Sequence, residues 1–393
     1  MIHLIKFKNF FSFKEEALIS LKVSEKAPNT EKYIVDKTKT RLTKILAVFG
    51  HNAAGKTNAL KAISFLQWFI VNAYTEDPDT EISISPFEFV REKKPTEMMV
   101  EFSIGQDLYL YYVNLTPEKV INEKLQKKIL GKKKFKTLFE RSWDNEENNY
   151  IWKDNFGLGV RFRERLRKNA SVLATSIRDN HKESIRIFDF WNKISVNVGL
   201  AGKVDNEKYL IGEAAFFFSK NNKLKQKADE LLQKFDLGLK AIEIIKKKET
   251  NHSVSFDLKG VHHNNYTLSF QFESSGTRKF FAILKHILYV LEKGGVAVLD
   301  EFDTDLHPMM SEKLLEMFFS KETNPHNAQL IFSAHSPHLL NLLDKYQIAL
   351  TEKDKKGESE IWRLDEMKGV RLDDNYYAKY LAGAYGGVPN FDL

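Results

Sequence analysis

The pattern of apolar and polar residues is most informative at residues 44–73. Residues 44–49 form a short, mostly apolar run that predicts a buried strand, and this run leads directly into Gly50. After residue 57 the apolar side chains recur at helical spacing, at Leu60, Ile63, Leu66, Phe69 and Ile70. The pattern therefore predicts a strand, a glycine-containing loop and a helix in direct succession.

The rest of the N-terminal half is predicted to contain strands first and helices later. Residues 2–7 alternate apolar with polar side chains, which predicts an edge strand, and residues 17–23 predict a second strand. From residue 81 to about 152, starting with a strand at 82–84, a period of two and many aromatic residues indicate a meandering antiparallel sheet. From about residue 156 to 235 the spacing becomes helical, without sustained heptads.

The C-terminal part alternates strands with helices. The apolar runs predict strands at residues 241–245, 253–258, 266–272, 296–300 and 329–333, with one helix after Gly276 and another after Pro308. Such alternation implies a largely parallel sheet covered by helices, and hence an α/β fold.

Composition narrows the class of protein. Of 393 residues, 42% are hydrophobic, which is enough for a sizeable core, and the absence of cysteine excludes disulfides and thiolate metal sites. No apolar run is long enough to span a bilayer and no signal peptide is visible, so we expect a cytoplasmic protein with no membrane partner.

The net charge is +7, with Lys/Arg clusters at residues 127–136, 161–168 and 246–248. These clusters indicate either contact with nucleic acid phosphates or a solvated face.

Residues 50–57, GHNAAGKT, match the pattern G-x-x-x-x-G-K-[ST] in full. Backbone N–H groups of such a loop point at phosphate oxygens, and the start of the following helix favours negative charge. Lys56 is predicted to neutralise the β- and γ-phosphates of ATP, and the Thr57 hydroxyl to bind Mg²⁺. The predicted nucleotide-binding residues in this part of the chain are Gly50, Asn52, Ala53, Ala54, Gly55, Lys56, Thr57 and Asn58.

A second motif, VAVLDE at residues 296–301, places two carboxylates at the end of a buried strand. Asp300 is predicted to hold Mg²⁺ through water, and Glu301 to act as the general base on the attacking water. Two exposed acids at a strand end are the alternative.

Two further segments extend the pattern. In ESSGTR at residues 273–278, Ser275 and Gly276 stand at a predicted helix start, where backbone amides approach a phosphate; an ordinary helix cap is the alternative. In FSAHSP at residues 332–337, His335 follows a buried strand, where an imidazole senses a γ-phosphate or positions water; a structural histidine is the alternative.

The order of these four motifs resembles the ABC-type ATPase heads of SMC-like and OLD-family proteins. DEFDTDLHP at residues 300–308 is similar to the OLD-family stretch, and FKNFFSF at residues 7–13 to the opening of such heads. YLAGAYGGVP at residues 380–389 resembles the end of bacterial ABC-like ATP/GTP phosphatases. That group serves in anti-phage defence and includes the AriA ATPase of the PARIS system and RloB-associated ATPases.

The resemblance implies a head-to-tail homodimer, or a higher oligomer, with two ATP molecules between subunits. The loop of one head then faces Ser275 and Gly276 of the other, and Asp305 lies in the loop that crosses between heads. Phe11 stands where many relatives carry a phosphate-contacting arginine, for which Lys8 or Lys14 is the expected substitute. No Q-loop glutamine is placed, since neither Gln67 nor Gln106 has a convincing context.

The two halves of the composite motif set lie near opposite ends of the chain and must meet in space. We therefore expect an ABC-type P-loop ATPase head made of residues 1–155 and 241–393, with an antiparallel β subdomain and a helical insertion at 156–240. The segment after Pro337 is too short for the Toprim nuclease domain of OLD proteins, so any nuclease or toxin activity is expected on a separate Toprim-like or RloB-like effector.

Three functions follow as hypotheses. The first is an ATP-hydrolysing sensor and scaffold that controls a separate effector in bacterial anti-phage defence. The second is an SMC-like DNA-binding ATPase of DNA repair or recombination, for which the basic clusters argue. The third, weaker hypothesis is a transporter ATPase subunit, against which the helical insertion and the antiparallel region argue.

Overall fold

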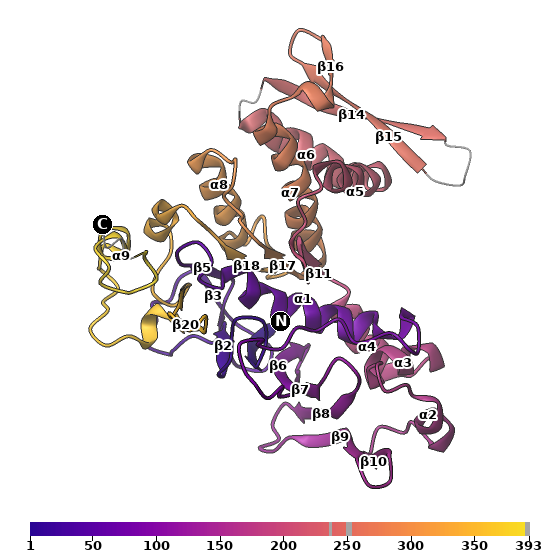
Figure 1. The fold of residues 1–393 in the computed structure, drawn as a ribbon. Helices are drawn as coiled ribbons and strands as arrows, with labels where there is room; N and C mark the ends of the chain where they lie inside the picture. The colour runs from indigo at the N-terminus through magenta and orange to yellow at the C-terminus, as the bar shows by residue number, and fades with distance from the viewer. Residues whose placement is uncertain (236–237, 249–253, 390–393) are drawn as a thin grey trace.

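The computed structural model describes residues 1–235, 238–248 and 254–389. A seven-stranded antiparallel sheet forms one side of the molecule (Figure 1). Its strands, in spatial order, are β10 (Asn149–Asp154), β9 (Lys136–Asp144), β8 (Val120–Ile129), β7 (Asp107–Leu115), β6 (Thr96–Ile104), β1 (Ile2–Lys8) and β2 (Ala17–Ser20). The predicted meander is confirmed, since each strand from β6 to β10 pairs with the next in the sequence.

Two local predictions for this sheet are wrong. β1 is not an edge strand, because it pairs with β2 on one side and β6 on the other. Its alternation has a different cause, since from His3 onward every second side chain is buried (His3, Ile5, Phe7) while those between are less enclosed. Residues 82–84 are not a strand, although Ile82 is buried there.

A six-stranded sheet carries the motif-bearing strands. Its order is β11 (Ile194–Val196), β17 (Val296–Leu299), β18 (Gln329–Ser333), β5 (Ile45–Phe49), β19 (Ile348–Lys353) and β20 (Ser359–Arg363), all parallel except β20. Every residue of β5, β17 and β18 is buried, which explains their continuous apolar runs. The predicted, largely parallel sheet is confirmed.

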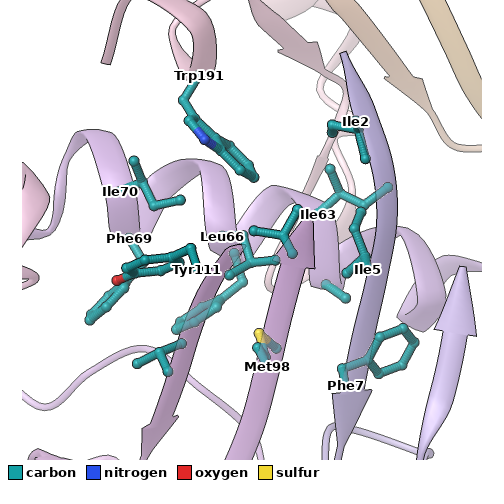
Figure 2. Close-up of a cluster of buried hydrophobic side chains, with 14 of the residues drawn as sticks. Ile2, Ile5, Phe7, Ile63, Leu66, Phe69, Ile70, Met98, Tyr111 and Trp191 are labelled. Atoms are coloured by element: carbon teal, nitrogen blue, oxygen red, sulfur yellow. The ribbon is translucent and has the colours of Figure 1, made fainter. Parts of the chain in front are cut away.

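Helix α1 (Lys56–Val71) lies between the two sheets. Figure 2 shows its Ile63, Leu66, Phe69 and Ile70 side chains beside residues of β1, β6 and β7 and beside Trp191. The same hydrophobic cluster includes residues of β17 and β18, so α1 is packed against both sheets. The loop before α1 is thereby held on a rigid base.

Residues 156–240 are distributed over two places. α2 (Val160–Arg165), α3 (Val172–Ser176) and α4 (Lys182–Trp191) lie beside the antiparallel sheet, whereas α5 (Glu207–Lys220) and α6 (Asn222–Lys234) lie beside α7 (Ser275–Lys293) (Figure 1). Between these groups, β11 joins the parallel sheet, and the hairpin of β12 (Val198–Gly199) and β13 (Gly202–Lys203) packs on α1.

The helices α5, α6 and α7 carry a small three-stranded sheet that projects from the molecule (Figure 1). Its strands are β14 (Leu239–Lys248), β15 (Val254–His262) and β16 (Thr267–Ser269); the predicted start of β15 at residue 253 lies outside the described residues. The remaining elements are β3 (Tyr33–Val35), β4 (Arg41–Thr43), α8 (Pro308–Phe319) and α9 (Tyr376–Leu381). No helix in the described part of the chain is both long and apolar enough to cross a membrane.

Candidate functional site

The glycine loop between β5 and α1 has a backbone that only glycine accommodates at its two ends. Gly50 has φ +155°, and a Cβ atom there would lie 2.4 Å from the backbone oxygen of Thr351. Gly55 has φ +115°, and a Cβ atom there would lie 2.6 Å from the Ser359 hydroxyl. Since any larger residue would collide with β19 or β20, both glycines are required for the shape of the loop.

Lys56 is the first residue of α1 and its side chain turns back into the loop. The residue is buried, and Nζ donates to the backbone oxygens of Gly50 at 2.8 Å and His51 at 3.0 Å. Burial lowers the pKa of Lys56, while the nearby carboxylates of Asp300 and Glu301 act in the opposite direction. An anion bound to the loop would add to the effect of these carboxylates and favour the charged ammonium further.

Thr57 and Asp300 meet although 243 residues separate them. The Thr57 hydroxyl donates to Asp300 Oδ2 at 2.8 Å, and the Ser333 hydroxyl donates to Asp300 Oδ1 at 2.5 Å. Asn197 brackets the same residue, since its amide bonds both the N–H of Asp300 (2.6 Å) and its carbonyl (3.1 Å). A hydroxyl beside a carboxylate is a donor set that suits Mg²⁺, which binds hard oxygen ligands.

Glu301 has an unusual backbone conformation and two partners for its carboxylate. Its φ is +48°, which is uncommon outside glycine and clusters at functional sites. Lys203 Nζ donates to Oε2 at 2.7 Å, and His335 Nε2 lies 3.3 Å from Oε1. The hydrogen bond and charge of Lys203 are the main reasons why the pKa of Glu301 is lowered, with His335 contributing less.

Asp303, in the loop after β17, holds the loop after β18 in place through hydrogen bonds. Its carboxylate accepts hydrogen bonds from the backbone N–H groups of His335 (3.1 Å) and Ser336 (2.6 Å). The imidazole of His335 is thereby placed beside Glu301. The histidine is exposed rather than buried, which weighs against a purely structural role.

One cleft of about 580 Å³ collects most of the predicted residues. Its lining residues are Asn52, Ala53, Gly55, Lys56, Thr57, Asn58, Glu301, Thr304, His335 and Lys353. Gly50, Ala54 and Asp300 lie directly behind this lining and position it. A larger groove of about 940 Å³ lies between α5, β15 and α7 and is also lined by charged side chains, but none of the predicted site residues lines it.

Ser275 and Gly276 do not line this cleft. They form the start of α7, where Ser274 caps the helix by accepting from Thr277 N at 3.1 Å. A Cβ atom on Gly276 would lie 2.9 Å from the backbone oxygen of Asp305, so these two segments touch within one chain. Ser275 and Asp305 are both exposed, and Lys279 forms an ion pair with Asp305.

Three residues near the site lie outside every sequence motif. Asn197 and Lys203 come from the region expected to be a helical insertion, and no local pattern marked them. Lys353 ends β19 and lines the cleft without belonging to any motif. Gln67 and Gln106 do not line the cleft, so no Q-loop glutamine is identified there among the described residues.

Comparisons with known proteins agree with this geometry. Residues 45–341 match the family model AAA_21, described as "AAA domain, putative AbiEii toxin, Type IV TA system". No curated protein matches the chain by sequence.

Several solved structures are similar to the chain. One, described as the SmcHead bound to the C-winged helix domain of ScpA, has a TM-score of 0.52 and 14% identity over 92% of this chain and 97% of that chain. An SMC head domain from Thermotoga maritima has a TM-score of 0.43 and 13% identity over 92% and 98%. An SMC head from Pyrococcus furiosus, with an extended coiled coil and bound to the C-terminal domain of ScpA, has a TM-score of 0.43 and 12% identity over 92% and 96%. The first similarity, together with the family match, confirms the predicted α/β fold of an ABC-type P-loop ATPase head with an antiparallel β subdomain.

Proposed function

The chain belongs to the AAA family whose model matches its residues 45–341, and from that premise we propose that it binds and hydrolyses ATP with Mg²⁺ and dimerises around ATP. In the proposed role the dimer is a sensor and scaffold that controls a separate effector in bacterial anti-phage defence. One observation carries the ATPase proposal, namely that a single cleft brings Lys56 and Thr57 together with Glu301 and His335.

The side chains divide the reaction between them. Lys56 and the loop amides bind the phosphates, and Thr57 with Asp300 would hold Mg²⁺, which neutralises charge that develops on the phosphates. Glu301 accepts a proton from the attacking water, with its carboxylate oriented by Lys203 and His335. For this step Glu301 must be ionised, and Lys203, which lowers the pKa of Glu301, favours the ionised form.

The position of Ser275 and Gly276 supports a site shared by two copies. Both lie outside the cleft of their own chain, at the exposed start of a 19-residue helix. In the proposed head-to-tail dimer, this helix start faces the phosphates bound by the partner subunit, since backbone amides at such a position favour anions. Asp305, which touches Gly276, then lies at the boundary between the two heads.

We further propose that the effector is a separate protein and that the pair acts in anti-phage defence. The family description names an AbiEii toxin of a type IV TA system, which supports a place in a toxin or defence module. The resemblance to the AriA and RloB-associated ATPases supports a separate Toprim-like or RloB-like effector and a cytoplasmic location. We also propose that the chain is divided into two parts of the ATPase head, residues 1–155 and 241–393, and a helical insertion at residues 156–240. Co-purification with the product of the neighbouring gene tests the effector; no complex at any nucleotide condition would contradict it.

ATP hydrolysis is tested by phosphate release from the purified chain. We expect Mg²⁺-dependent release by the wild type and none by Lys56→Ala, because that variant lacks the ammonium that binds the phosphates. Lys313→Ala, which removes an exposed lysine of α8, is the matched control and should retain activity. Equal rates in wild type and Lys56→Ala would refute an ATPase reaction at this cleft.

DNA binding is the second candidate function, because a basic turn projects from the antiparallel sheet. Lys132, Lys133 and Lys134 are exposed there, between β8 and β9. In contrast, Lys127 is engaged by Asp107 and Glu183. Salt-dependent binding of duplex DNA, lost when the three exposed lysines are changed to glutamine, would favour this function. No binding at low salt would count strongly against it.

A further inference from the structure

The cleft contains a second lysine, which no motif predicted. Lys353 is the last residue of β19 and lines the cleft together with Lys56. It is half-buried, and no carboxylate in residues 1–235, 238–248 and 254–389 forms an ion pair with it. A half-buried ammonium facing a phosphate-binding loop is suited to an anionic ligand.

The lysines expected to replace the missing arginine at Phe11 are engaged elsewhere. Lys8 Nζ lies 3.3 Å from Glu15, and Lys14 Nζ lies 2.7 Å from Glu358, whose hydrogen bond raises the pKa of Lys14. The Phe11 ring is itself covered by the ammonium of Lys61, 4.0 Å from the ring centre. Neither Lys8 nor Lys14 lines the cleft.

The hairpin that carries Lys353 is tied directly to the segment beside Phe11. In that hairpin Lys353 lies opposite Ser359, whose backbone N–H donates to Ser12 O at 2.7 Å. The hydroxyls of Ser359 and Ser12 are 2.8 Å apart, and Asn58 Nδ2 donates to the Ser12 hydroxyl at 2.9 Å. The hairpin that carries Lys353 is thus fixed against the residue that follows Phe11 and against the start of α1.

The strand order shows which end of the nucleotide Lys353 faces. The strands run β17, β18, β5 and β19, so Glu301 and His335, which follow β17 and β18, lie on one side of the loop. Lys353, at the end of β19, lies on the other side. If the γ-phosphate faces Glu301 and His335, the α-phosphate at the other end of the triphosphate is directed toward Lys353.

We propose that Lys353 binds the α-phosphate of a nucleoside di- or triphosphate and takes the place of the arginine that Phe11 replaces. This rests on the proposed function, since it assumes a nucleotide in the cleft. Both ATP and ADP carry an α-phosphate, so the contact stabilises both complexes and does not change with the loss of the γ-phosphate. Lys353 therefore sets affinity and leaves the turnover number unchanged.

The test is equilibrium binding of ATP and ADP to Lys353→Met. Loss of a charge-assisted hydrogen bond should weaken both nucleotides by roughly tenfold, with KM raised to a similar extent and kcat unchanged. Lys353→Arg should restore binding. Lys355→Met removes an exposed lysine of the same hairpin outside the cleft and controls for net charge, and Lys14→Met tests the rival lysine.

The outcomes separate this inference from the proposed function. If the wild type binds neither nucleotide, the proposed function fails. If the wild type binds both and Lys353→Met binds them equally well, or if Lys355→Met loses as much affinity, the assignment of Lys353 is overturned. Loss confined to ATP would also overturn it, because the lysine would then contact the γ-phosphate. A thermal melt of each variant confirms that it is folded at the temperature of the measurement.

Discussion

One glutamate paired with a cation lies within the antiparallel sheet and another lies just beyond the parallel sheet, and the two pairs differ in almost every other respect. Glu123 and Arg141, on β8 and β9 of the antiparallel sheet, are fully buried. Besides Arg141, Glu123 accepts from the Tyr111 hydroxyl at 2.8 Å and the Val172 N–H at 2.9 Å. In contrast, Glu301 and Lys203, beyond the parallel sheet, are 36% and 18% exposed, and Glu301 lines the cleft.

The comparison shows that the surroundings, not the charges, decide what such a pair does. Burial raises the pKa of Glu123 even beside Arg141, so this carboxylate depends on its fixed partners. Lys203 lowers the pKa of Glu301, whose carboxylate remains open to solvent on one side. A pair enclosed by its own sheet can only stabilise the fold, whereas a pair at a strand end can exchange a partner for water or a phosphate.

The largest expected effect is that of Glu301→Gln on turnover. The amide cannot accept a proton from water, so kcat should fall by roughly 10²- to 10⁴-fold, as expected for loss of a general base. ATP affinity should be retained. Single-turnover kinetics and nucleotide binding measure the two quantities. Glu316→Gln, at an exposed position of α8, is the control, and an unchanged rate in Glu301→Gln would refute the role of base.

The buried pair should respond through stability. Arg141→Met leaves Glu123 without its counter-charge, so the free energy of unfolding should fall by about 3–5 kcal/mol. Denaturant unfolding measures this change. The half-exposed pair Lys124–Glu140 on the same two strands provides the control, since Lys124→Met should cost about 1 kcal/mol or less. Equal losses in the two variants would contradict the comparison.

A smaller effect is expected at His335. Its ring contacts Glu301 at 3.3 Å, so His335→Ala should slow hydrolysis by about tenfold, in the range of one charged hydrogen bond, with a modest loss of affinity. His338→Ala removes the next imidazole of the same loop, which does not line the cleft. Steady-state phosphate release measures both variants. Equal rates in His335→Ala and His338→Ala would show that His335 has no role in hydrolysis.

The smallest effect is a displacement of the pH profile. Lys203 lowers the pKa of Glu301, so in Lys203→Met that pKa rises, and more of the base is protonated at acid pH. The acid limb of kcat/KM should therefore move to higher pH, with little change at neutral pH. Lys203→Arg and Lys208→Met, the latter on the exposed side of α5, should retain the wild-type limb. A limb that does not move in Lys203→Met would contradict the coupling.

The parts of the site that could be predicted from the sequence are those made by consecutive residues. The apolar runs before Gly50 and before Asp300 predict buried strands, and the candidate site residues follow directly after each strand. Asn197 and Lys353 could not be found in this way, because pairing with distant strands brings them to the site. Lys203 was missed because the packing of the hairpin of β12 and β13 on α1 brings it there. Strand pairing also explains the wrong prediction for β1. The alternation of its residues predicted an edge strand, but β2 pairs with the edge that was expected to be free.

In the proposed function the cleft is half of a composite site that a second copy completes, so the protein should associate only when ATP is bound. Light scattering on Glu301→Gln with ATP and Mg²⁺, where hydrolysis does not reverse the complex, should give twice the monomer mass. The same protein without nucleotide should be a monomer, and so should the double variant Glu301→Gln/Ser275→Glu, which places a negative charge at the exposed start of α7. A monomer under all nucleotide conditions, or a dimer that also forms in the Ser275→Glu variant, would contradict a site shared by two copies.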